Sequence, residues 1–295
     1  MNTINIRAYG KINLGLDVIR KREDGYHEVS MIMQSVDLYD TLTISRTKDP
    51  SIRVRTNLSY LPNDRRNLVY KAAELFRNTL RLKDGIRITL EKRIPVAAGM
   101  AGGSSDAAAT LKGLNQLFQA GYSEEALKQL GVKLGADVPY CIQLGTALSE
   151  GIGELLTPLK PIPDCHILLV KPDISVSTRY VYENLKLTEN ILHPDISSML
   201  SAIDEGNLEA LTSCMDNILQ TVTVPEHPII DEIKTRMKER GALVSLMSGS
   251  GPTVFGIYDS LSVAQTAYRY FLEASYGKTV HLVKPYWPVI NKQKR

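Results

Sequence analysis

The sequence predicts a mixed fold of β-strands and α-helices. Residues 85–92 alternate apolar and polar side chains, which is typical of a half-buried strand. Residues 107–118 instead repeat apolar side chains at helical spacing. The 295 residues suffice for two ordinary domains or one large one. Prolines at 158, 161 and 163 mark a candidate boundary, so we expect domains over residues 1–157 and 158–295.

The first strand is expected over residues 4–8 and ends in the segment GKINL, residues 10–14. Lys11 and Asn13 are two residues apart, so in an extended segment they face the same way. They are either two solvated side chains or two groups directed at one ligand.

An Asp24-Gly25 turn follows and presents Tyr26 and His27. These two side chains can stack on and hydrogen-bond a planar ring, or they are simply a half-buried tyrosine and a surface histidine. Further strands are expected over residues 31–36, 41–46 and 52–56, and Asn67 is expected to cap a helix.

Residues 95–109, PVAAGMAGGSSDAAA, form a glycine-rich loop between a strand and a helix. Glycines let a backbone approach a ligand closely, and Ser104, Ser105 and Asp106 are expected to cap the helix. The N–H groups and dipole at a helix start suit a phosphate, although such turns also occur without a ligand. The Walker and dinucleotide-binding patterns are both absent.

Asp137 is flanked by small and apolar residues in LGADVPY, residues 134–140. It is either a helix cap or a catalytic carboxylate, and Pro139 is expected to keep Val138 out of the helical region. Residues 123–125 begin the preceding helix, with acids in its first turn.

The second half begins with a strand over residues 166–170, and a helix follows that Ser177 or Thr178 caps. Pro228 opens another helix that ends at Gly241. A second glycine loop, MSGSGPT at residues 247–253, lies between strands and is either a hairpin turn or an anion-binding nest. A helix over 262–274 and a strand over 279–283 follow.

Composition and charge exclude several classes of protein. The chain is 43% apolar and 23% charged, as soluble proteins are, and its net charge of +3 gives no argument for nucleic acid as a partner. No apolar run is long enough to span a membrane, and no signal peptide is seen. The three cysteines have neither zinc nor disulfide spacing, so we expect a cytoplasmic protein.

Three stretches together resemble the motifs of the GHMP kinase superfamily: residues 10–14, 95–109 and 248–255. The middle stretch is similar to the phosphate loop P-x-x-x-G-L-G-x-S-S-A, with Met100 for the usual leucine and Ala101 for a frequent glycine. Ala101 takes a positive φ less readily than glycine does. The resemblance implies a two-domain α+β fold, with an N-terminal ATP-binding half like ribosomal protein S5 domain 2 and a C-terminal α/β half.

Four stretches are most similar to the superfamily members that act on CDP-methylerythritol: KINL (11–14), GYH (25–27), GADVP (135–139) and SGSGPT (248–253). This implies ATP-dependent phosphorylation of the substrate 2-hydroxyl, in the non-mevalonate route to isoprenoids. The alternatives are a homoserine- or mevalonate-type kinase and a non-catalytic relative that binds nucleotide and sugar. The family typically needs Mg²⁺, whose ligands stay open here; Ser104 or Ser105 with phosphate oxygens is one suggestion.

The same resemblance implies roles for single residues. Asp137 would take the hydroxyl proton, and Lys11 would keep it ionised and stabilise charge on the oxygens in transit. Whether Asp137 is a full base or an orienting group is left open. The ATP phosphates would lie on Pro95, Val96, Ala97, Ala98, Gly99, Met100, Ala101, Gly102, Gly103, Ser104 and Ser105.

The substrate would occupy a second set of residues. An aromatic pair, Tyr26 and Tyr182, would sandwich the cytosine, and His27 would bond its edge. The methylerythritol end would contact Asn13 and Thr178, and the diphosphate would contact Gly249, Ser250 and Gly251.

Overall fold

Two β-sheets organise the computed structural model, which describes residues 2–188, 191–274, 276–277 and 279–288. The first sheet contains β1 (Thr3–Lys21), β2 (His27–Thr47), β3 (Ile52–Thr56), β4 (Gly85–Glu91), β5 (Thr146–Glu150) and β6 (Leu155–Pro158). Its strand order is β3-β4-β2-β5-β6, with β1 paired to β2. Only the β3–β4 pair is parallel.

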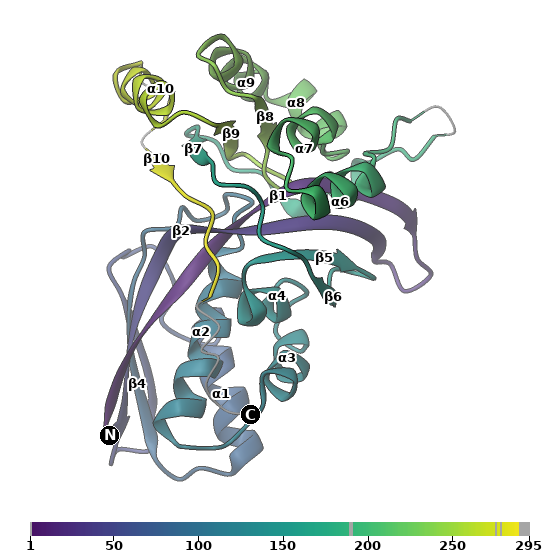
Figure 1. Cartoon of the computed structure of the whole chain (residues 1–295). Helices are drawn as coiled ribbons and strands as arrows, with labels where there is room; N and C mark the ends of the chain where they lie inside the picture. Colours follow the sequence, from purple (N-terminus) through teal and green to yellow (C-terminus); the bar gives the residue numbers. More distant parts are fainter. Residues whose placement is uncertain (1, 189–190, 275, 278, 289–295) are drawn as a thin grey trace.

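β1 and β2 form one long antiparallel hairpin where we expected several short strands. β1 continues to Lys21, well past the segment of residues 10–14 in which it was expected to end, and β2 joins the strands expected at 31–36 and 41–46. The expectation was wrong because the alternation was not followed far enough: apolar residues at 12, 14, 16 and 18 continue it to Val18, with polar residues or glycine between them. In Figure 1 this hairpin passes between the helices of the first half and the elements of the second.

Four helices cover one side of the first sheet: α1 (Leu68–Leu80), α2 (Gly102–Leu117) and α4 (Val138–Gln143) contact its strands, and α3 (Glu124–Val132) packs on α2 and α4. Asn67 caps α1 by accepting from the Val69 N–H, and Ser123 caps α3 by accepting from the Ala126 N–H. Both starts were predicted from the sequence. The apolar faces of these helices join the larger of two buried core clusters.

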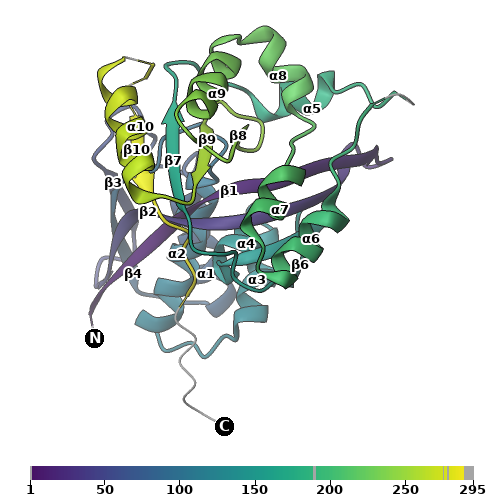
Figure 2. The same ribbon diagram turned by 45° about the horizontal axis from the view of Figure 1, so that its top comes forward.

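The second sheet is antiparallel, in the order β10-β7-β9-β8. Its strands are β7 (His166–Lys171), β8 (Val244–Met247), β9 (Val254–Tyr258) and β10 (Thr279–Val283). The helices of this half are α5 (Thr178–Asn184), α6 (Ile196–Glu205), α7 (Leu208–Cys214), α8 (Gln220–Glu226), α9 (Ile229–Glu239) and α10 (Leu261–Glu273). Figure 2 shows α6 and α7 beside the hairpin of β1 and β2. No helix within the described ranges is long and apolar enough to cross a membrane.

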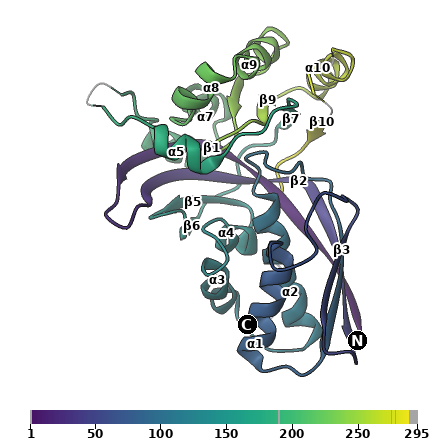
Figure 3. The same ribbon diagram turned by 180° about the vertical axis from the view of Figure 1, so that it is seen from behind.

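Main-chain bonds join the two halves at two places. Leu16 of β1 donates its N–H to the Asp216 carbonyl and accepts from the Ile218 N–H, each at 3.0 Å. After β10 the chain returns to the first sheet, where the Tyr286 N–H donates to the Ser35 carbonyl at 2.8 Å (Figure 3). Both halves therefore hold β1 and β2 in place.

Candidate active site

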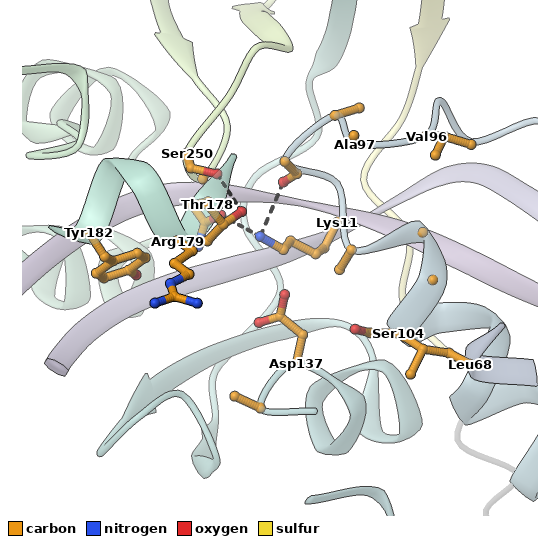
Figure 4. Close-up of a pocket in the computed structure, with 18 of the residues that line it drawn as sticks. Lys11, Leu68, Val96, Ala97, Ser104, Asp137, Thr178, Arg179, Tyr182 and Ser250 are labelled. Atoms are coloured by element: carbon orange, nitrogen blue, oxygen red, sulfur yellow. Dashed lines mark hydrogen bonds between the residues drawn. The ribbon is translucent and has the colours of Figure 1, made fainter. Parts of the chain in front are cut away.

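A cavity of about 990 Å³ lies between the two halves. Its walls are β1, the glycine-rich loop with the start of α2, the loop before α4, the start of α5 and the second glycine loop. Figure 4 shows Tyr182 at one end, Leu68 and Val96 at the other, and Lys11 facing Asp137 between them. The groups that can exchange protons therefore lie in the middle of the cavity.

Lys11 and Asn13 lie on β1 at register shifts of the hairpin. The Lys11 side chain is 5% exposed, and its Nζ donates to Asn13 Oδ1 at 2.7 Å and to the Gly99 carbonyl at 3.2 Å. The expectation that the two side chains face the same way is confirmed. Within the described part of the chain Lys11 forms no ion pair, so its charge is available to a ligand.

Asp137 occupies the N-cap position of α4, yet its side chain makes no capping bond. The carboxylate instead points into the cavity, opposite Lys11 (Figure 4). The residue therefore lies at the start of the helix, but its carboxylate is not used to cap it. The expectation for Val138 was wrong: it begins α4, because Pro139 lies in the first turn, where a helix needs no N–H from it.

The glycine-rich loop enters α2 through a left-handed residue. Ala101 is the N-cap, with a φ of 54° and no side-chain capping bond, so the expectation that Ser104, Ser105 or Asp106 caps this helix was wrong. Ala97 also has a positive φ, of 50°. Since Ala101 supplies no side-chain cap to this 16-residue helix, and its first residues line the cavity, the helix start suits an anion.

Most of the predicted phosphate loop lines the cavity. The residues that do so are Pro95, Val96, Ala97, Ala98, Gly99, Ala101, Gly102, Gly103 and Ser104. Met100 does not, since it is buried in the smaller core cluster. Ser105 is 2% exposed, and its hydroxyl donates to the Tyr9 carbonyl at 2.5 Å. The Ser105 hydroxyl therefore holds the loop against β1 and does not face the cavity.

The second glycine loop packs directly on the first. A Cβ on Gly99 would lie 2.0 Å from the Ser248 carbonyl oxygen, so only glycine permits this approach. Asn217 holds the second loop by donating to the carbonyls of Met247 and Gly249, at 2.7 and 2.8 Å. Gly249 and Ser250 line the cavity as predicted, whereas Gly251 does not.

The far end of the cavity carries the aromatic residues. The rings of His27 and Tyr182 lie 5.2 Å apart at 41°, although they come from opposite halves of the chain. Tyr26 also lines the cavity and is 60% exposed. Thr178 contacts the second glycine loop, with its Oγ1 2.8 Å from Ser250 Oγ. Burial, and after it the charge of Lys21, lowers the pKa of His27 below its usual 6.5.

A buried ion cluster, formed by Lys92, Asp40 and Asp106, lies beneath the glycine-rich loop. Lys92 Nζ is 2.5 Å from Asp40 Oδ2 and 2.8 Å from Asp106 Oδ2. Burial lowers the pKa of Lys92, but the two carboxylates outweigh it and raise that pKa. Burial also raises the pKa of Asp106 well above its usual value. Sequence reasoning missed this cluster and took Asp106 for a helix cap.

Sequence reasoning also missed Arg179, the second residue of α5, which lines the cavity. A signal was available, because Arg179 precedes Tyr182 by three residues and such pairs share one face of a helix. Asn217 gave no such signal, since its partners lie about thirty residues away in the sequence.

Comparisons with known proteins agree with this architecture. Residues 67–145 match the family model described as GHMP kinases N terminal domain, and residues 199–277 match GHMP kinases C terminal. A protein of Lachnoclostridium phytofermentans named 4-diphosphocytidyl-2-C-methyl-D-erythritol kinase is 56% identical over 284 residues, covering 96% of this chain and 98% of the relative.

Two solved structures are also similar. A crystal structure of 4-(cytidine 5'-diphospho)-2C-methyl-D-erythritol kinase has a TM-score of 0.81 and 32% identity, covering 97% of this chain and 100% of the other. A homoserine kinase from Cytophaga hutchinsonii has a TM-score of 0.79 at 19% identity, covering 96% of this chain and 94% of the other. The second likeness shows the fold alone.

Proposed function

Because the chain belongs to the GHMP kinase family, we propose that it transfers the γ-phosphoryl group of ATP to the 2-hydroxyl of 4-diphosphocytidyl-2-C-methyl-D-erythritol. The products are the 2-phosphate and ADP, and the reaction belongs to the non-mevalonate route to isoprenoid precursors. The observation that carries the proposal is the cavity itself. It has an aromatic end, an uncapped helix start, and Lys11 facing Asp137 between them (Figure 4).

In this mechanism Asp137 accepts the proton of the substrate hydroxyl while that oxygen attacks the γ-phosphorus. Lys11 stabilises the charge that develops on the transferring oxygens. Asn13 and the Gly99 carbonyl accept hydrogen bonds from the Lys11 amine, which fixes its position. Phosphoryl transfer depends mainly on such positioning and on charge neutralisation.

The ATP phosphates lie on the glycine-rich loop and on the uncapped start of α2, where main-chain N–H groups bind them. No cluster of three metal-binding side chains occurs among the described residues. The Ser104 hydroxyl does supply an oxygen atom to the cavity, apart from the Asp137 carboxylate that serves as the base. Such an oxygen fits Mg²⁺, which binds few protein oxygens and completes its shell with phosphates and water. Ser104 would help to hold the ion, which would supply positive charge against the phosphates of ATP.

A substrate panel separates this proposal from its rivals. Purified protein with ATP and Mg²⁺ should release ADP with CDP-methylerythritol, and not with mevalonate or homoserine. Turnover of the latter two alone would indicate another kinase of the family. Binding of ATP and CDP-methylerythritol without turnover would indicate a non-catalytic relative.

Tyr182→Ala should raise the KM for CDP-methylerythritol about 10- to 100-fold, because stacking on a base is worth about 1–3 kcal/mol. The KM for ATP should stay unchanged. Tyr180→Ala is the matched control, since Tyr180 lies on the same helix, bonds Glu226 and is absent from the cavity wall. Equal effects of both changes would argue against stacking.

The pH dependence of the KM for CDP-methylerythritol should show the titration of His27. Since its pKa is lowered, the ring is neutral at pH 7 and can accept a hydrogen bond from the cytosine amino group. Steady-state kinetics should give a constant KM for CDP-methylerythritol between pH 7 and 8, and a rise as the pH falls below about 6.5. His27→Gln should lose this rise. A variant that keeps it would assign the titration to another group.

We also propose a domain boundary and a cellular location. The domain division at residues 157 and 158 is supported by the end of β6 at Pro158, eight residues before β7 begins. A cytoplasmic location is supported by the free thiols of the three cysteines.

A further inference from the structure

Among the described residues, four lysine and arginine side chains line the cavity between the two halves: Lys11, Arg66, Lys92 and Arg179. Lys92 is committed elsewhere, because it pairs with two buried carboxylates. Arg66 is not on the substrate side, because it lies two residues before Leu68, which Figure 4 shows at the opposite end of the cavity from Tyr182. Lys11 lies at the reacting centre. The proposed reaction brings a triphosphate and a diphosphate into one cavity, so the substrate side needs a cation of its own.

Arg179 lies where that cation is needed. It follows Thr178, whose hydroxyl contacts Ser250, and it precedes Tyr182 by three residues on the same helix. In Figure 4 its guanidinium group lies between the Tyr182 ring and the pair of Lys11 and Asp137. A substrate with its base at Tyr182 and its hydroxyl at Asp137 would place the connecting diphosphate there.

We propose that Arg179 binds the diphosphate of the nucleoside-diphosphate substrate and so helps to determine specificity. The inference rests on the proposed function and adds a recognition group to it. A guanidinium group can donate two parallel hydrogen bonds to a phosphate, whereas a lysine amine acts as a point charge. Arg179 touches the substrate away from the transferring phosphoryl group, so it acts on binding and leaves the chemical step to Lys11 and Asp137.

Glu183 holds Arg179 when the substrate is absent. Arg179 Nε donates to Glu183 Oε1 at 2.7 Å, and the two side chains are 86% and 55% exposed. An exposed pair of this kind contributes little to stability, so the diphosphate can replace the carboxylate readily. Glu183 also lines the cavity, and its negative charge opposes a diphosphate that does not engage Arg179.

Competitive inhibition by CDP and by cytidine tests the proposal, because the two ligands differ only in the diphosphate. In Arg179→Ala, the inhibition constant of CDP and the KM for CDP-methylerythritol should each rise about 10- to 100-fold. The inhibition constant of cytidine, the KM for ATP and kcat should stay close to wild type. Arg179→Lys should recover part of the loss. Arg53→Ala is the matched control, since Arg53 is exposed, pairs with a carboxylate four residues away and lies outside the cavity wall.

Several outcomes would overturn the proposal. An equal loss for cytidine and CDP would mean that the change displaces α5, and a fall in kcat with unchanged KM would place the guanidinium at the transferring phosphoryl group. Glu183→Gln should lower the inhibition constant of CDP, because it removes a negative charge near the diphosphate. If Glu183→Gln instead raised that constant as much as Arg179→Ala does, the site would need the ion pair itself. Failure of the wild type to turn over CDP-methylerythritol contradicts the proposed function. If the wild type turns over CDP-methylerythritol but Arg179→Ala keeps the wild-type KM and CDP inhibition constant, only this inference is contradicted.

Discussion

Asp137→Asn should lower kcat about 10²- to 10⁴-fold, which is the usual contribution of a positioned base. The amide has the shape of the carboxylate but cannot accept the hydroxyl proton. Because Asp137 makes no capping bond, the change should leave α4 and the free energy of unfolding as they are. Steady-state kinetics with saturating ATP and CDP-methylerythritol measure the loss, and thermal unfolding measures the stability.

Asp173→Asn provides the control, since Asp173 is exposed and lies outside the cavity wall. The KM values of Asp137→Asn should stay near those of the wild type, because the proton moves only during the chemical step. Full activity of Asp137→Asn would exclude it as the base. A small loss, of about tenfold or less, would fit a group that only orients the hydroxyl.

Lys92→Met should destabilise the protein by about 3–5 kcal/mol, because it leaves two carboxylates buried without their cation. Asp40 and Asp106 both face Lys92 Nζ, and their side chains are almost wholly inaccessible to water. A loss of this size is a large part of the total stability of a domain. Urea unfolding at pH 7 measures it.

Two variants calibrate this result. Lys71→Met removes an exposed lysine from α1 and should change stability by less than about 0.5 kcal/mol. Asp106→Asn should cost less than Lys92→Met, since Asp106 Oδ1 has no hydrogen-bond partner among the described residues and the pair of Lys92 and Asp40 survives. Combining Lys92→Met with Asp106→Asn should restore part of the loss. If Lys92→Met cost no more than Lys71→Met, the cluster would have no structural role.

Local rules account for what the sequence predicted well. Asn67 and Ser123 cap helices through main-chain N–H groups two or three residues away, so short stretches suffice to find them. Lys11 and Asn13 face the same way because alternation is a property of any extended strand. The roles of Lys11 and Asp137 came from the family resemblance, since their two positions meet only in the fold.

Long-range packing accounts for what the sequence did not predict. Asp106 has the residue type and position of a cap, yet it pairs with Lys92, fourteen residues earlier, because the left-handed Ala101 already begins α2. Asp40 is 52 residues from Lys92, and no periodic pattern connects them. The length of β1 is an exception, since the alternation continues through residues 11–18 and a local rule would have extended the strand.

The return of residues 284–286 to β2 affects how this chain reaches its native state. Gln34 Nε2 donates to the Tyr286 carbonyl, and these two residues are 252 positions apart. During synthesis, this stretch of β2 must wait for its partner until the whole second half has emerged. Unpaired strand edges favour aggregation, and distant pairings slow folding. Two family models divide the chain, but the first half expressed alone would leave main-chain groups of Ser35 and Asp37 unpaired. We therefore expect the two halves to fold together.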